Sequence, residues 1–359
     1  MRLIDSTRNP GYPAGVTSFS SRIIRWQQAH GRHALPWQAI RDPYRIWLSE
    51  IMLQQTQVAT VIPYFERFLT RFPDLQALAS ADEDIVLALW SGLGYYSRAR
   101  NLHAAARIIV ENHQGTFPSS AEAIAKLPGV GRSTAAAIAA LAFGQRGAIL
   151  DGNVKRVLAR HGGIDGWPGA KSIEAKLWQL AERYLPRAGI ETYTQGMMDL
   201  GALACTRSRP ACLACPVSVD CAAYTQNRVA ELPTPRPKKN LPEKEVVLLL
   251  LLDRGELMLE KRPSHGIWGG LWSLPELALE TDAATHCHDH FGLTTVAQQT
   301  LPRFSHSFTH FRLHIQPMQM QLANRGVSRP GQIWLPPADA LNTGLPAPVR
   351  KLVTQLLRP

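Results

Sequence analysis

The sequence predicts a multidomain protein with an all-α domain, residues 1–230, followed by an α+β domain, residues 244–359. In the first domain, apolar residues recur every three to four positions, the period of helices that bury one face. In the second, the apolar segments are short and typical of strands. Between them, residues 231–243 are rich in Pro and Lys, a composition typical of a stiff, extended linker.

Turn residues and prolines set the expected helix boundaries of the first domain. Pro43, Pro63 and Pro118 are expected near helix starts, where the missing N–H of proline costs little. The predicted helices are 18–30, 43–61, 63–70, 82–90, 95–112, 119–125, 131–143, 151–160, 172–185 and 190–203.

The second domain is expected to hold a sheet flanked by two weak helices. Its longest apolar run, 246–252, is far short of the ~20 residues that span a bilayer, so we expect a buried strand and no membrane partner. The predicted strands are 245–252, 256–261, 269–274, 296–303 and 307–317, and the helices are 281–291 and 347–357.

The charge balance favours a polyanionic partner. The 359-residue chain has a formal net charge of +11, and each Lys or Arg that meets a phosphate releases a counterion. A basic protein without a nucleic-acid partner is the alternative. The segment Met1–Gly15 lacks the apolar core of a signal peptide, so we expect a cytoplasmic protein.

Four of the five cysteines form one cluster with the spacing Cys-x6-Cys-x2-Cys-x5-Cys. Without an export signal, such a cluster predicts a metal site rather than disulfides. On spacing alone, a structural zinc ion is the safer prediction, and an iron–sulfur cluster is the alternative. Cys287 stands apart and is expected to be a free thiol. The four candidate ligands are Cys205, Cys212, Cys215 and Cys221.

A second motif is the turn Leu-Pro-Gly-Val-Gly, which contains Gly129 and Gly131 and precedes a helix rich in small residues. The glycines allow a tight turn that aims the first N–H groups of the helix outward, where they can hold a phosphate. Arg132 adds charge. An ordinary helix–helix turn is the alternative.

Two carboxylates are candidates for catalysis. Asp151 opens the helix 151–160 and could stabilise positive charge or serve only as an N-cap. Glu50 lies among apolar residues; burial would raise its pKa and suit it to act as an acid, and an exposed surface Glu is the alternative.

Together these motifs resemble the endonuclease III superfamily of helix-hairpin-helix DNA glycosylases. Glu50 within Ser-Glu-Ile-Met-Leu-Gln-Gln-Thr-Gln resembles the adenine-excising branch, and the resemblance runs from about Ser18 to the end of the chain. It implies a [4Fe–4S] cluster on the four cysteines. It also implies that Glu50 protonates adenine and that Asp151 stabilises the sugar cation.

The resemblance assigns further residues to catalysis. Asn153 and Ser133 join Glu50 and Asp151 in the catalytic group. Ser133 stands where strand-cleaving relatives have the Lys that forms a Schiff base, so simple hydrolysis is expected. Lys155 is expected to contact a phosphate and could react incidentally with the abasic product.

The resemblance also assigns residues to the DNA and to the flipped base. Other members carry Arg and Glu where this chain has Gln38 and Gln195. The implied DNA contacts are Gln55, Tyr95, Arg98, Gly129, Gly131, Arg132 and Lys155, and the implied adenine pocket is Trp37, Gln38 and Gln195.

The second domain resembles the Nudix-like domain of the family. It lacks the Glu-rich helix of Nudix hydrolases, so no pyrophosphatase activity is expected. Thr309 and His310 are expected to recognise 8-oxoguanine, and the segment 304–306, Phe-Ser-His, is the alternative. Metal binding by His306, His310 and His314 is a minor alternative.

The sequence therefore predicts a monofunctional, monomeric DNA glycosylase of base excision repair in the bacterial cytoplasm, associated with the nucleoid. Its expected substrate is double-stranded DNA with adenine opposite 8-oxoguanine or guanine. A glycosylase/lyase for oxidised pyrimidines is the competing enzyme, and Ser133 and the second domain argue against it. A non-catalytic iron–sulfur DNA-binding protein is the other alternative, and the Glu50 and Asp151 pair argues against it.

Overall fold

The computed structural model describes residues 18–38, 40–237, 240–325 and 329–358, so the segment Met1–Gly15 lies outside the described residues. The chain forms two compact units. The first comprises residues 1–66 and 105–238, and the second comprises residues 67–104 and 239–359. Residues 67–104, which the sequence groups with the all-α domain, thus fold with the C-terminal sheet.

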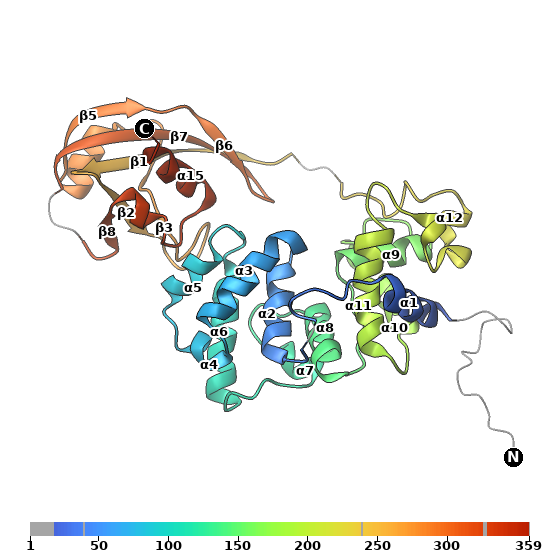
Figure 1. Ribbon diagram of the computed structural model, residues 1–359. Helices are drawn as coiled ribbons and strands as arrows, with labels where there is room; N and C mark the ends of the chain where they lie inside the picture. Colours follow the sequence, from blue (N-terminus) through green and yellow to red (C-terminus); the bar gives the residue numbers. More distant parts are fainter. Residues whose placement is uncertain (1–17, 39, 238–239, 326–328, 359) are drawn as a thin grey trace, which may run out of the picture. The chain divides into compact units, whose positions relative to one another are not determined.

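The first unit is built from helices around an apolar core (Figure 1). Small residues such as Ala136 and Ala137 let α8 pack closely on its neighbours, with Leu158 and Met197 buried opposite them. Its elements are α1 (Phe19–His30), α2 (Pro43–Leu53), the first part of α3 (Val58–Arg71), the second part of α6 (Ser97–Asn112), α7 (Ala121–Ile124), α8 (Arg132–Phe143), α9 (Gly152–His161), α10 (Lys171–Arg183), α11 (Ile190–Asp199), the π-helical turn η1 (Leu200–Ala204), the 3-10 turns η2 (Cys212–Ala214) and η3 (Ser218–Asp220), and α12 (Ala222–Thr225).

The expected helix 43–61 is wrong, because the chain breaks it in two. Helix α2 ends at Leu53, and α3 begins at Val58. Gln55 between them has a φ of 59°, in the left-handed region that ends helices. Pro63, expected at a helix start, lies inside α3.

The second unit joins short helices to an eight-stranded sheet. The strand order is β3-β2-β1-β7-β5, with β4 paired to β1, β6 to β7 and β8 to β2. Its elements are α4 (Leu75–Ala79), α5 (Glu83–Trp90), β1 (Glu243–Asp253), β2 (Glu256–Lys261), β3 (Trp272–Ser273), β4 (Glu276–Leu277), α13 (Ala283–His286), the π-helical turn η4 (Cys287–Phe291), β5 (Thr294–Thr300), β6 (Phe304–Ser307), β7 (Arg312–Asn324), β8 (Gln332–Leu335), α14 (Pro337–Ala340) and α15 (Ala347–Leu356).

Strands β1 and β7 form the centre of the sheet and are parallel to each other (Figure 1). The run Leu248–Leu251 in β1 is fully buried, because a central strand is covered on both faces. The expected strand 307–317 is confirmed for residues 312–317, which begin β7, whereas Ser307 ends β6 and residues 308–311 form the turn between them. The two strands form an antiparallel hairpin that pairs Phe304 with Ile315 and Ser307 with Arg312. The described residues include no helix long and apolar enough to cross a membrane.

Hydrogen bonds tie the helices of the second unit to its C-terminal elements. The backbone carbonyl of Leu345 accepts bonds from Ser91 Oγ at 3.1 Å and from the Tyr96 hydroxyl at 3.0 Å. Asp84 accepts bonds from Lys261 and from Trp272 Nε1. These contacts explain why residues 67–104 fold with the sheet.

Candidate active site

Glu50 lies on α2, a helix that buries most of its surface. Asp42 caps the helix through the N–H groups of Tyr44 and Arg45, and Trp47 is fully buried. Glu50 is partly buried, so the exposed surface Glu considered from the sequence is not what the structure holds. Burial, with the nearby charge of Asp151, raises the pKa of Glu50 to about 7. A carboxyl with this pKa can donate a proton at neutral pH.

Asp151 caps helix α9. Its Oδ1 accepts the backbone N–H of Val154 at 2.7 Å, so the N-cap role considered from the sequence is confirmed. Burial raises the pKa of Asp151, and hydrogen bonds from the N–H groups of Val154 and Asn153 oppose this shift. The cap fixes the carboxylate in place beside the helix N-terminus, where negative charge is favoured.

The structure gives the two other expected catalytic residues supporting contacts. Ser133 Oγ accepts the backbone N–H of Leu150 at 2.8 Å, which anchors the residue before Asp151. Asn153 Oδ1 accepts a bond from Arg156 Nη2 at 2.8 Å. Direct roles in catalysis stay predictions for both.

Arg156 links this group to the cysteine loop, and the sequence reasoning missed it. Its Nε donates to the carbonyl of Cys205 at 2.7 Å, and its Nη2 donates to that of Gly201 at 2.7 Å. A Cβ on Gly201 would lie 2.5 Å from Asn153 Cβ, closer than real contacts allow. Only glycine therefore lets η1 approach the start of α9. The sequence held one signal for this role: Arg156 follows Asn153 by three residues, so both lie on the same side of the helix.

The expected hairpin lies between α7 and α8. Gly129 has a φ of 75°, in the left-handed region that favours glycine, and Gly131 is the N-cap of α8 with open space beside it. Arg132 pairs with Glu182 and lies over the ring of Trp178, 3.9 Å from its centroid.

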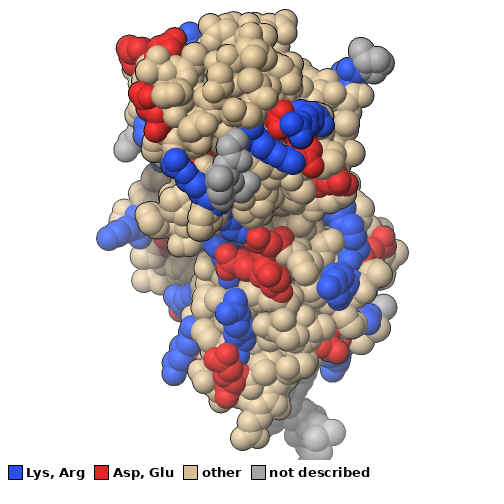
Figure 2. Space-filling view, turned by 90° about the vertical axis from the view of Figure 1, so that its left-hand side faces the viewer, with Lys and Arg blue, Asp and Glu red and all other residues tan. Residues whose placement is uncertain are grey.

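Lys155 is likewise ion-paired, with its Nζ 2.7 Å from Glu174 Oε1. On the face drawn in Figure 2, basic and acidic side chains also lie next to one another. A phosphate that binds Lys155 or Arg132 therefore competes with an internal carboxylate. Their contacts with DNA stay predictions.

The two residues expected to enter the DNA share an unusual backbone. Gln55 has a φ of 59° and Tyr95 a φ of 48°, both uncommon for residues other than glycine. The Tyr95 side chain is 44% exposed. Strained backbone of this kind gathers at functional sites.

Arg98, expected to contact DNA, is buried and supports the Tyr95 turn. Its Nη2 donates to the carbonyls of Leu93 and Gly94, each at 3.1 Å, and its guanidinium lies 5.6 Å from the Tyr95 ring centroid. Burial lowers the pKa of Arg98 to about 10, still well above neutral pH. A phosphate contact by Arg98 stays a prediction.

The three residues expected to hold adenine line one cavity of about 280 Å³. Trp37 and Gln38 come from the segment before α2, and Gln195 comes from α11. Ile46 of α2, one helical turn before Glu50, also lines it. Among the described residues that line this cavity there is neither Glu50 nor Asp151.

The four clustered cysteines line a single cavity whose walls include Val157 and Leu200. All four are free thiols. Burial and the neighbouring thiols raise the pKa of Cys215 to about 11, so four thiolates here need a cationic partner. Arg160 Nη1 donates to Cys205 Sγ at 3.4 Å. This donor set fits an iron–sulfur cluster.

Across the described ranges, no three His, Cys, Asp or Glu side chains are placed to chelate a single metal ion. Neither His306, His310 and His314 nor the four clustered cysteines form such a group.

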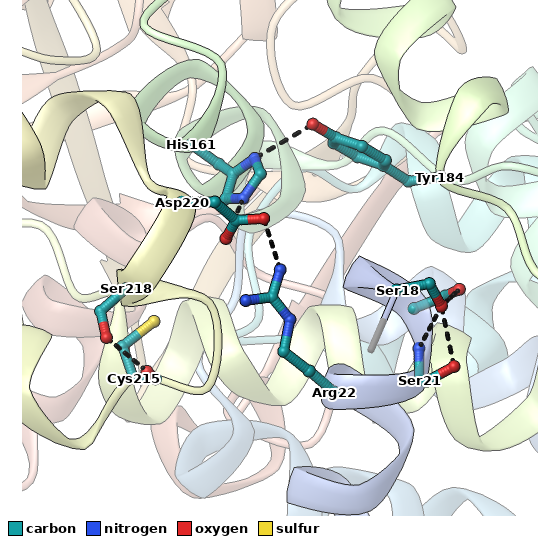
Figure 3. A network of polar contacts seen from close by, with 9 residues as sticks. Ser18, Ser21, Arg22, His161, Tyr184, Cys215, Ser218 and Asp220 are labelled. Carbon is teal, nitrogen blue, oxygen red and sulfur yellow. Dashed lines mark hydrogen bonds and ion pairs between the residues drawn. The ribbon is translucent and has the colours of Figure 1, made fainter. Parts of the chain in front are cut away.

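A polar network ties α1 to the cysteine loop (Figure 3). Arg22 Nη2 lies 2.5 Å from Asp220 Oδ2, and His161 Nε2 lies 3.2 Å from Asp220 Oδ1. The Tyr184 hydroxyl lies 3.2 Å from His161 Nδ1. Because Asp220 precedes Cys221, this network holds the end of the loop against α1 and α9.

The second unit has a larger cavity of about 670 Å³, lined by Tyr95, Tyr96 and the hairpin turn between β6 and β7. Thr309 and His310 lie in this turn, whereas Phe304 and Ser305 lie within strand β6. The ring of Trp268 lies 5.6 Å from that of Phe308, and Arg100 donates to the carbonyl of Gly269. Recognition of a damaged base by Thr309 and His310 stays a prediction.

Comparison with known proteins agrees with this architecture. Residues 48–183 match the family "HhH-GPD superfamily base excision DNA repair protein", and residues 246–355 match the family "NUDIX domain". A solved structure of "a thermostable thymine-DNA glycosylase" is 30% identical and superposes with a TM-score of 0.52, covering 58% of this chain and 95% of that one. The fold and the site define a helix-hairpin-helix glycosylase with an appended Nudix-type domain.

Curated relatives narrow the assignment. An adenine DNA glycosylase of Buchnera aphidicola subsp. Schizaphis graminum (strain Sg) is 38% identical over 338 residues, 93% of this chain and 97% of the relative. An adenine DNA glycosylase of Mus musculus is 34% identical over 405 residues, 94% of this chain and 78% of the relative. The chain belongs to the adenine DNA glycosylase family.

Proposed function

We propose that the protein hydrolyses the N-glycosidic bond of adenine paired with 8-oxoguanine or guanine in double-stranded DNA. The observation that carries the proposal is the pair formed by Glu50 and Asp151. Burial and the Asp151 charge raise the pKa of Glu50 to about 7, so the site offers an acid beside a second carboxylate. Adenine leaves poorly unless it is protonated, and the sugar then needs a negative charge nearby.

The chemistry uses these two groups in order. Glu50 transfers its proton to a ring nitrogen of the flipped adenine, and the glycosidic bond breaks with its electron pair going to the base. Asp151 stabilises the positive charge on the sugar. Water then adds to the anomeric carbon and gives up a proton to the Glu50 carboxylate, which restores the acid and leaves an abasic site.

The DNA strand stays intact in this scheme. Ser133 replaces the amine of the strand-cleaving relatives and holds the Leu150 N–H instead. Asn153, bound to Arg156, completes the catalytic group behind Asp151.

Flipping the adenine costs a few kcal/mol, and side chains must fill the gap. We assign Tyr95 and Gln55 to that task, which their strained backbones support. The phosphates meet the hairpin at Gly129 and Gly131, with Arg98, Arg132 and Lys155 contributing charge. The adenine enters the cavity lined by Trp37, Gln38 and Gln195.

Thr309 and His310 are assigned to the opposite base. Their turn lines the same cavity as Tyr95. This supports a role in recognising the base opposite adenine, next to the residue that we assign to intercalation. Thr309→Ala should reduce the preference for adenine opposite 8-oxoguanine over adenine opposite guanine. Thr309→Ser, which keeps the hydroxyl, is the matched control. An unchanged preference in Thr309→Ala would remove this residue from the assignment.

The four cysteines would hold a [4Fe–4S] cluster, which organises the loop between Cys205 and Cys221. Arg160 would neutralise part of its charge, and Arg156 would connect the Cys205 carbonyl to Asn153. We further propose that one chain acts alone, because it carries the acid, the carboxylate and both cavities. We also propose the nucleoid of the bacterial cytoplasm as its location, because chromosomal DNA is the proposed substrate.

A gel assay with three duplexes tests the proposal: adenine opposite 8-oxoguanine, adenine opposite guanine, and an oxidised thymine opposite adenine. Cutting of the adenine strand only after alkali is the expected result. Cutting at oxidised thymine without alkali would point to the lyase alternative instead.

The variant Glu50→Gln separates an enzyme from a non-catalytic DNA-binding protein. It keeps the shape of the side chain and removes the proton, so binding should persist while turnover falls at least about a hundredfold. Unchanged turnover would remove Glu50 from the mechanism.

A further inference from the structure

Asp199, the last residue of α11, is fully buried and accepts hydrogen bonds from two residues. Its Oδ2 accepts the backbone N–H of Arg32 at 2.9 Å. Its Oδ1 accepts Arg32 Nε at 2.8 Å and Gln195 Nε2 at 2.9 Å, and Arg32 Nη2 lies 2.7 Å away. A buried carboxylate needs such donors, because an unpaired one is costly.

The contact with Asp199 determines which way the Gln195 amide faces. An ionised carboxylate only accepts hydrogen bonds, so the amide atom beside it must be the NH₂ group. The amide oxygen of Gln195 is then left for other donors. Gln195 also lines the cavity of about 280 Å³ that contains Trp37 and Gln38.

We propose that Asp199 and Arg32 are positioning residues that select adenine by holding the Gln195 oxygen toward the base. The inference rests on the proposed function, which places adenine in this cavity. The exocyclic amine of adenine donates to an amide oxygen, whereas the oxygen of hypoxanthine at the same position would repel it. An amide free to rotate would offer its NH₂ group to hypoxanthine just as well.

The hydrogen-bond donors around Asp199 allow the orientation of the Gln195 amide to be reversed by substitution. In Asp199→Asn, two nitrogens of the Arg32 side chain still donate to the Oδ1 position, against one backbone N–H at the Oδ2 position. The Asn oxygen therefore stays at the Oδ1 position, and Gln195 keeps its orientation. Arg32→Met alone leaves the buried carboxylate without its ion-pair partner, so this single variant does not preserve the charge that orients Gln195 and is not a control. Only the double variant lets the Asn oxygen turn to the backbone N–H of residue 32, so its NH₂ group faces Gln195 and reverses that amide.

The experiment measures single-turnover release of adenine and of hypoxanthine, each opposite 8-oxoguanine, by the full-length protein. We expect the ratio of the two rates to fall about tenfold or more in Arg32→Met/Asp199→Asn, the effect of exchanging one hydrogen bond for a repulsion. Asp199→Asn alone should keep the wild-type ratio, even where its rate falls. A double variant with the wild-type ratio would overturn the proposal.

A second variant covers the case in which the double variant does not fold. Gln195→Met removes the amide and leaves Asp199 paired with Arg32, so its ratio should lie between those of the wild type and the double variant. An unchanged ratio in Gln195→Met would also overturn the proposal. If the wild type releases no adenine at all, the proposed function fails, and that result is distinct from either of these.

Discussion

Ser133 Oγ accepts the backbone N–H of Leu150 at 2.8 Å, directly before Asp151 in the chain. Removing this acceptor in Ser133→Ala leaves a partly buried N–H without it, which should lower the free energy of unfolding by about 1 kcal/mol. Adenine release should slow, because Asp151 loses an anchor. Denaturant unfolding and single-turnover kinetics measure the two effects. Ser133→Thr keeps the hydroxyl and should restore both the stability and the rate. Equal losses in Ser133→Thr and Ser133→Ala would contradict this role of the hydroxyl.

The pKa of Glu50 predicts a pH dependence. The protonated form is the active one, so adenine release should fall as the pH rises through about 7. Glu50→Gln should be slow at every pH and lack this transition. Single-turnover rates between pH 5.5 and 9 test it, and a rate that rises through pH 7 would argue against Glu50 as the acid.

The same pKa has a consequence for stability. Because the folded state binds the Glu50 proton more tightly than the unfolded chain, this group stabilises the fold in acid. That contribution is lost as the pH rises through about 7. Thermal unfolding of Glu50→Gln should therefore shift upward relative to the wild type above pH 7. No relative shift between pH 5 and pH 8 would mean that the Glu50 pKa is ordinary.

Gly201 allows η1 to approach α9, so Gly201→Ala should displace Asn153 and the start of that helix. We expect adenine release to fall at least about tenfold, since small misplacements of catalytic groups are costly. DNA-binding titrations and kinetics measure this. The exposed neighbour Ala202, changed to Ser, is the control. Wild-type rates in Gly201→Ala would show that this approach does not position the catalytic group.

Metal analysis of the purified protein tests the cysteine site. About four iron atoms and about four sulfides per chain are expected for the proposed cluster, and one zinc ion per chain would support the alternative weighed from the sequence. Cys212→Ser should reduce the metal content. Cys287→Ser should not, because Cys287 is buried in the apolar core of the sheet unit.

The contacts of Leu345 predict what truncation does. A chain that ends at residue 238 loses the carbonyl that accepts from Ser91 and Tyr96, along with the sheet. Hydrogen exchange should accelerate across α5 and the turn that carries Tyr95, while α9 to α11 serve as the internal control. Equal protection in the truncated and the full-length chain would show that the helices of the second unit are stable alone.

The sequence predicts most helices and the sheet, because an element that buries one face has apolar residues at regular intervals. It fails at Gln55, where an unbroken helical period hides a residue with left-handed backbone. It finds Glu50 and Asp151 because their motifs are local. It does not find Arg32 or Asp199, since their partnership spans 167 positions and depends on how α11 packs.

The grouping of residues 67–104 with the C-terminal sheet bears on how such proteins can be recombined. A chimera of two relatives joined at the linker would mismatch the partners of Leu345 and Asp84. Crossovers within α3 and α6, together with one near residue 238, would take each unit entirely from one relative. Substitutions in the Tyr95 turn and in the C-terminal domain should accordingly occur together among relatives, because both segments belong to one unit.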